Sequence, residues 1–120
     1  MGKVLAVDDS ATMRQMVATS LKEAGHQVSE AADGDDALRK CQSERFDLVI
    51  TDVNMPNKDG LTLIKELRGV NGYRFTPILF LTTESRSDLK EQAKASGATG
   101  WLVKPFKPDQ LMAAVGKVLR

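Results

Sequence analysis

Val4-Leu5-Ala6-Val7-Asp8-Asp9 is the stretch that decides the fold, because an apolar run of strand length ends abruptly in two acidic residues. Four further short apolar runs follow at residues 28–31, 48–50, 78–81 and 101–103. Segments with a helical spacing of apolar side chains separate these runs. The alternation predicts an α/β fold, in which a five-stranded parallel sheet with right-handed crossovers carries helices on both faces. The runs lack a clean polar and apolar alternation, as expected of strands that are covered on both faces.

Length and composition indicate one folded domain over residues 1–120. Hydrophobic residues make up 42% and charged residues 28% of the sequence, which excludes an intrinsically disordered chain. The net charge is only +1, so the overall charge does not predict binding to nucleic acid or to an anionic membrane. Cys41 is the only cysteine, and no apolar stretch is long enough for a signal peptide or a membrane span. We therefore expect a cytoplasmic protein without disulfides, cysteine-based metal clusters or membrane insertion.

The segments between the strands predict helices of unequal quality. The first helix is expected to end at Gly25 and to bury Met13, Met16, Val17, Leu21 and Ala24. The last has Pro108 in its first turn and is expected to bury Leu111, Met112, Val115, Val118 and Leu119. Shorter helices are expected over residues 35–43 and 60–68. The segment 87–96 offers only Leu89, Ala93 and Ala95, so it predicts either a weakly packed, movable helix or a merely solvated one.

Charged and hydroxyl side chains follow four of the apolar runs, which is where ligands bind in sheets of this kind. They are Asp8, Asp9, Asp52, Thr82 and Lys104. If the first and third strands are neighbours, the carboxylates gather at one edge and repel one another unless a cation lies among them. Oxygen ligands suit Mg²⁺, and an ionised Asp52 beside Mg²⁺ and Lys104 is suited to attack phosphorus. Taken singly, each residue is also typical of a helix cap, a turn or a solvated surface.

The combined motifs resemble those of a known family. They are Val7-Asp8-Asp9-Ser10 with Met13-Arg14, Asp52-Val53-Asn54-Met55-Pro56 with Asp59-Gly60, Thr82-Thr83-Glu84, and Lys104-Pro105-Phe106. Spread over essentially the whole chain, they resemble the receiver domain of bacterial two-component response regulators, and most closely the stand-alone, CheY-type chemotaxis regulators. The resemblance implies a flavodoxin-like (βα)5 fold, a doubly wound sheet with strand order 2-1-3-4-5.

The resemblance also implies a role for each matching residue. Asp52 matches the phosphoacceptor, and Asp8 and Asp9 match the acidic pair of a Mg²⁺ site completed by Asp52 and the backbone carbonyl of Asn54. Lys104 matches the lysine that contacts the phosphoryl group, and its bond to Pro105 is cis in the family. Thr82 matches the switch hydroxyl, while Asn54 and Glu84 occupy the positions that vary with the lifetime of the phosphoryl group. We expect comparatively fast self-dephosphorylation.

Trp101 departs from the family pattern, because tyrosine or phenylalanine is usual at its position. Its larger ring disfavours the inward rotamer that the family aromatic adopts, so it either reports on switching and partner contact or anchors the last helix from an edge strand. The two interpretations stay open.

Partners follow from the same resemblance. The chain has no GxxxxGK[ST] phosphate loop, and its sole histidine, His26, is expected at the opposite edge of the sheet from Asp52. The phosphoryl group is therefore expected from a sensor histidine kinase of chemotaxis type or from a small donor such as acetyl phosphate. No effector domain follows Arg120, so we expect output by docking through the fourth helix, last strand and last helix, for example to the flagellar motor switch. A phosphatase is a further possible partner.

Other functions stay open beside this one. Within the family, the chain is alternatively a phosphate shuttle or sink, or part of another chemosensory pathway. In a different class, a haloacid-dehalogenase-like phosphatase passes through an aspartyl phosphate, but it uses a second aspartate where this chain has Asn54. A flavin carrier is disfavoured because Asp8 and Asp9 repel phosphate, and a transcription factor because no basic recognition helix is present. We therefore expect a signalling switch rather than a classical enzyme.

Overall fold

The computed structural model describes residues 2–52, 60–70, 72–82, 87–104 and 106–119. Strands and helices alternate along the chain: β1 (Lys3–Val7), α1 (Ala11–Glu23), β2 (Gln27–Ala31), α2 (Gly34–Ser43), β3 (Leu48–Asp52), α3 (Gly60–Arg68), β4 (Ile78–Thr82), α4 (Ser87–Ser96), β5 (Gly100–Val103) and α5 (Pro108–Val118). The strands form one parallel sheet in the order β2-β1-β3-β4-β5. The predicted α/β fold and its strand order are confirmed.

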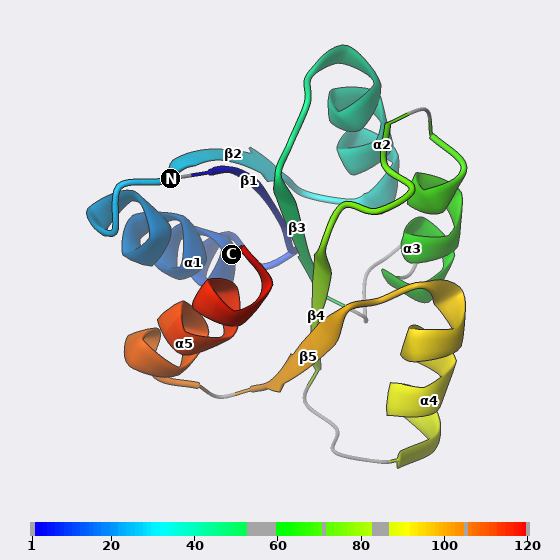
Figure 1. The fold of residues 1–120 in the computed structure, drawn as a ribbon. Coiled ribbons are helices and arrows are strands. Elements are labelled where there is room, and N and C mark those ends of the chain that lie inside the picture. The colour runs from blue at the N-terminus through cyan, green and yellow to red at the C-terminus, as the bar shows by residue number, and fades with distance from the viewer. Residues whose placement is uncertain (1, 53–59, 71, 83–86, 105, 120) are drawn as a thin grey trace.

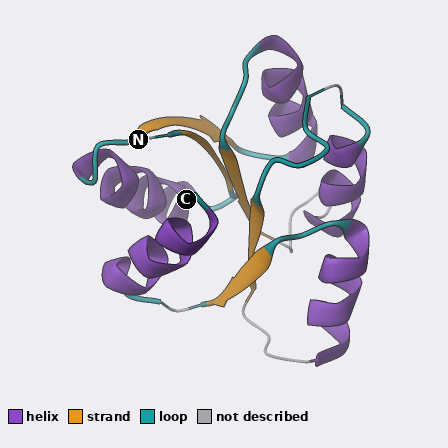
Figure 2. Ribbon diagram, viewed as in Figure 1, coloured by secondary structure: helices purple, strands orange, loops and turns teal. Residues whose placement is uncertain are grey.

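The helices form two layers, one on each face of the sheet (Figures 1 and 2). Helices α1 and α5 cover one face, and α2, α3 and α4 cover the other (Figure 1). Successive residues of a strand point to opposite faces, so Leu5 and Val7 pack toward α2 and α3 whereas Val4 and Ala6 pack toward α1 and α5. Both sets are buried, which explains why the strand sequences show no polar alternation.

The predicted helix bounds agree with the structure to within one or two residues. Residue Gly25 has a φ of 96°, the left-handed conformation that glycine adopts at little cost, as predicted for the end of the first helix. One expected burial is wrong: Ala24 is the C-cap of α1 and its side chain is exposed, because the helix ends one residue before it. Helix α2 begins at Gly34 rather than Asp35, since the side chain of Asp33 caps it by accepting from the backbone N–H of Asp36 at 2.8 Å.

The described side chains of α4 are those of residues 91–96. Ala93 and Ser96 are its buried side chains among residues 91–96, whereas Ala95 is exposed; the side chain of Leu89 lies outside the described part. The helix packs beside α3, and the loop after it is fixed by the guanidinium of Arg68, which donates to the carbonyl oxygen of Gly97 from Nε at 3.1 Å and Nη2 at 2.6 Å. Among the described residues, no helix has the length and apolar character needed to cross a bilayer.

Candidate functional site

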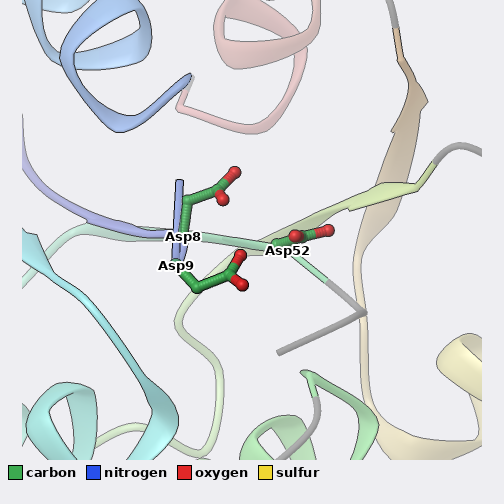
Figure 3. Close-up of side chains that lie close together, drawn as sticks. All are labelled: Asp8, Asp9 and Asp52. Carbon is green, nitrogen blue, oxygen red and sulfur yellow. The ribbon is translucent and has the colours of Figure 1, made fainter. Parts of the chain in front are cut away.

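An acidic trio, made of Asp8, Asp9 and Asp52, lies at the carboxyl ends of the central strands. Strands β1 and β3 pair in parallel with Val7 beside Thr51, so the residues that end these strands are neighbours. Each member of the trio offers a carboxylate oxygen, and these oxygens all lie within 4.8 Å of one another. Figure 3 shows the three carboxyl groups extending from the two strand ends in the same general direction. Asp8 and Asp52 are 2% and 6% exposed, whereas Asp9 is exposed to solvent.

Lys104 supplies the positive charge that the structure places against this trio. It follows β5, and its Nζ lies 3.2 Å from Oδ2 of Asp8 and 3.3 Å from Oδ2 of Asp52. Its side chain is 13% exposed, so this contact is shielded from solvent far more than a surface ion pair. The backbone N–H of Lys104 donates to the carbonyl oxygen of Thr82 at 2.7 Å, which ties the lysine to the end of β4.

The charges at this site do not balance. Among the residues that the structure describes, three carboxylates face one ammonium, which gives these four groups a formal charge of −2. Two like charges at such a separation repel by about 3 kcal/mol even at an effective dielectric constant of about 20. Oxygen donors of this kind, from two carboxylates buried in the protein and one open to water, fit a hard divalent cation such as Mg²⁺ that keeps several water ligands.

The acidic turn after β1 is fixed by hydrogen bonds on both sides. Oδ1 of Asp8 accepts from the backbone N–H of Ser10 at 2.9 Å, and the hydroxyl of Ser10 caps α1 by accepting from the N–H of Met13 at 3.2 Å. Nη1 of Arg14 donates to the carbonyl oxygen of Asp8 at 2.7 Å, while its Nε lies 3.1 Å from Oε1 of Glu30. The sequence predicted no role for Arg14 or Glu30, although Arg14 is part of the matching motif and lies one turn into the helix that follows the acidic pair.

Thr82 ends β4 and Trp101 lies on β5, the two strands that follow β3 in the sheet order. Thr82 is fully buried at the end of β4, one residue past Leu81, which pairs with Asp52. Trp101 lies on the edge strand β5, 43% exposed, with its ring centroid 6.3 Å from that of Phe80. It borders a surface pocket of about 490 Å³ that reaches Ala114 of α5. The indole therefore combines an anchoring contact with an accessible surface.

Several predicted residues or their bonds lie outside the described part of the chain. They are Asn54, predicted as a metal ligand and lifetime residue, Glu84, its lifetime partner, and Pro105, predicted to follow a cis bond. His26 directly precedes β2, so it lies at the amino ends of the strands, opposite to Asp52, as expected. Its Nδ1 accepts from the backbone N–H of Gly2 at 3.0 Å.

Cys41 has no place at this site. It is buried in α2, and burial raises the pKa of its thiol to about 11, so the thiolate needed of a nucleophile is scarce at neutral pH.

Comparison with known proteins identifies the chain. Residues 4–116 match the family model of the response regulator receiver domain. The chemotaxis protein CheY of Pseudomonas aeruginosa is 35% identical over 97% of this chain and 94% of its own length. The transcriptional regulatory protein PdtaR of Mycobacterium tuberculosis is 40% identical over 94% of this chain, which spans 54% of that protein. The solved structure of CheY4 from Vibrio cholerae superposes with a TM-score of 0.97 at 54% identity, covering 99% of both chains. The chain thus belongs to the receiver domain family of response regulators.

Proposed function

We propose that this protein is a phosphorylation-activated switch of a chemosensory two-component system, in which Asp52 accepts a phosphoryl group from a histidine kinase in the presence of Mg²⁺. The observation that carries this proposal is the convergence of the acidic trio with Nζ of Lys104, 3.2 Å from Asp8 and 3.3 Å from Asp52. The likeness to CheY of Pseudomonas aeruginosa and to CheY4 of Vibrio cholerae favours chemotaxis over other outputs. We place the switch in the cytoplasm with its kinase.

The chain's own residues account for the chemistry of the transfer. An oxygen of Asp52 attacks phosphorus, a bond from this oxygen to phosphorus forms, and the bond from phosphorus to the histidine nitrogen of the donor breaks with its electron pair left on that nitrogen. Asp8, Asp9, Asp52 and the carbonyl of Asn54 would hold Mg²⁺, which would supply positive charge against the phosphoryl oxygens. Lys104 lies close enough to Asp52 to follow the phosphoryl group with its ammonium. The donor brings the energy, so the domain acts as an acceptor with comparatively fast self-dephosphorylation rather than as a classical enzyme.

Signal output is proposed to pass from Thr82 to the surface formed by α4, β5 and α5. A phosphoryl group on Asp52 adds acceptor oxygens beside the end of β4, where the Thr82 hydroxyl and the Lys104 ammonium are donors. Movement of Thr82 is proposed to displace the start of α4, the helix that follows β4 in the chain. Trp101, exposed on β5, then reports the change at a surface proposed to dock the flagellar motor switch. Action as a phosphate shuttle or in a non-flagellar pathway uses the same chemistry.

Phosphorylation is tested with Mg²⁺ and acetyl phosphate, with intact mass as the readout. We expect the mass of one phosphoryl group to be gained by the wild type and by Asp109→Asn, an exposed control on α5, and not by Asp52→Asn. Chelation of the metal should stop labelling. Labelling of Asp52→Asn at the wild-type rate contradicts the proposal.

Output is tested by a pull-down that compares the phosphorylated and unphosphorylated protein against motor-switch and kinase-array proteins. Phosphorylation-dependent capture of the motor switch supports a flagellar role, whereas capture of kinase components alone supports the shuttle. Asn54 and Glu84 are proposed to limit the phosphoryl lifetime, so a phosphorylated form stable for hours without a phosphatase contradicts that part.

A further inference from the structure

A second surface feature lies at the opposite end of the sheet from the acidic trio. Residues 45–47 precede β3 and residues 72–77 precede β4, so both segments lie at the amino ends of these strands (Figure 1). Residues of the two segments line a hollow of about 380 Å³, called here the Phe75 hollow. The Phe75 side chain is 86% exposed, twice the exposure of Trp101. An aromatic ring so fully in water at the rim of a hollow marks a candidate contact site.

Two arginines flank this ring. The guanidinium carbon of Arg74 lies 5.5 Å from the centroid of the Phe75 ring, and that of Arg45 lies 5.9 Å from the centroid of Tyr73. Both arginines are exposed, and no described carboxylate lies within 4.0 Å of either guanidinium. The one carboxylate of the hollow, that of Asp47, accepts from the backbone N–H of Lys3 at 2.8 Å.

The position of Arg45 is fixed by the backbone. Its Nη1 donates to the carbonyl oxygen of Gly72 at 2.7 Å. A Cβ added at Gly72, which has a φ of +93°, would lie 2.5 Å from the same Nη1. The positive φ favours glycine at this position, and the hydrogen bond places one planar guanidinium at the wall of the hollow with most of its donors unused by described residues.

We propose that the Phe75 hollow binds an acidic peptide segment of a partner protein, in which carboxylates flank an apolar side chain. The fork of a guanidinium pairs with a carboxylate through parallel hydrogen bonds, and Arg45 and Arg74 provide two such forks around an apolar ring. Arginine and aromatic residues are the side chains that most often dominate protein interfaces. A broad anionic surface fits less well, because Asp47 adds a negative charge inside the hollow whereas a peptide can place its apolar side chain there.

The location makes this contact independent of the switch. The hollow lies at the amino ends of β3 and β4, whereas Asp52 is at the carboxyl end of β3. A partner held there leaves both the acidic trio and the surface of α4, β5 and α5 open. Binding is therefore expected to have the same affinity before and after phosphorylation, and to keep the domain near a partner while the switch turns over.

The test uses a fluorescein-labelled dodecapeptide in which aspartates and glutamates flank one leucine, with a copy carrying lysines in place of the acids. Anisotropy gives the affinity, and amide chemical shifts locate the site. We expect binding of the acidic peptide alone, shifts centred on residues 72–76, and affinity at least about tenfold weaker for Arg74→Glu and for Phe75→Ser. Arg39→Glu, at an arginine of α2 outside the hollow, is the matched control and should bind like the wild type.

Three results overturn the proposal. One is the absence of shifts at residues 72–76 with millimolar acidic peptide. Another is an equal loss of affinity in Arg74→Glu and Arg39→Glu, which indicates bulk charge rather than a site. The third is tighter binding of the same residues to phosphatidylglycerol vesicles than to the peptide, which assigns the hollow to a membrane surface. Because Phe75 and Arg74 are exposed, folding is expected to survive both substitutions, and far-UV circular dichroism checks this.

Discussion

Replacing Arg68 should loosen the joint between α3, the loop before β4 and the end of α4. The guanidinium donates to three carbonyl oxygens: from Nη1 to Tyr73 at 2.9 Å and to Thr76 at 2.6 Å, and from Nε and Nη2 to Gly97 at 3.1 and 2.6 Å. Burial lowers the pKa of this arginine from its ordinary value, as expected of a charge withdrawn from water. The side chain of Arg68 thus joins α3 to the segment before β4 and to the loop after α4.

The size of the effect follows from the acceptors left behind. Arg68→Ala deprives three carbonyl oxygens of a donor, and each such loss costs about 1 kcal/mol, so we expect the free energy of unfolding to fall by about 3 kcal/mol. Arg68→Lys keeps the charge but cannot reach all three oxygens with one ammonium, so a loss of about 1 to 2 kcal/mol is expected.

Urea denaturation followed by circular dichroism measures these differences. Arg39→Ala is the matched control, because its contact with Asp36 at 3.3 Å is an exposed ion pair and its loss should change stability by less than about 0.5 kcal/mol. Hydrogen exchange should also quicken at the carboxyl end of α4 in Arg68→Ala, because Gly97 loses its tether. An Arg68→Ala protein as stable as the Arg39→Ala control refutes this account of the joint.

Three further predictions concern the acidic trio, the alkaline range and the end of α1. Lys104→Met removes the ammonium 3.2 Å from Asp8, so the free energy of unfolding of the metal-free protein should fall. Calorimetry should show several-fold tighter Mg²⁺ binding, because the carboxylates lose a competing positive charge. Weaker Mg²⁺ binding contradicts the charge argument. Burial raises the pKa of Cys41 to about 11 and of Tyr73 to about 12, both above their unfolded values. The stability that these two neutral groups contribute is therefore complete below about pH 9 and is lost as the pH rises through 11 and 12. Urea midpoints that stay constant from about pH 9 to 11 contradict this expectation. Gly25→Ala, at a φ of 96°, should lower the free energy of unfolding by about 1 kcal/mol. Gly116→Ala, in α5, should leave this free energy equal or raise it, because a Cβ added there meets open space. Thermal melts measure both.

The sequence predicted most of the fold because each strand is an apolar run bounded by polar or turn-forming residues. The bounds of β1, β2, β4 and β5 were missed by one residue each, and β3 extends two residues further, to Asp52, because the residues at these strand ends still pair with their neighbours. Strand β2 shows where the pattern weakens: as an edge strand it buries only Ala31 fully, so its sequence is the most polar of the five. Strand order came from the family resemblance rather than from the residues themselves.

The charged residues at the strand ends are the part of the site that could be predicted. Asp52 ends β3, whereas Asp8, Asp9 and Lys104 follow β1 and β5, and parallel topology alone brings such residues to one end of the sheet. Sequence reasoning could not tell that Asp8 is buried while Asp9 is exposed, because this difference depends on the turn into α1. It gave no role to Arg14, although that residue belongs to the matching motif, and it missed Arg68. Both arginines donate to backbone carbonyl oxygens, which side-chain patterns in a sequence do not reveal. The Phe75 hollow could not be predicted either, because residues 45–47 and 72–77 form it only when the chain folds.

The sheet separates the apolar interior into two compartments, and among the residues that the structure describes no buried side chain belongs to both. Residues such as Leu63 and Phe80 fill one, and residues such as Leu111 and Val17 fill the other. A change of volume beneath α5 therefore needs its compensating change beneath α1, not beneath α3. Over evolutionary time the two sides of such a domain can diverge at different rates, so the packing of α1 and α5 can change while that of α2, α3 and α4 is kept.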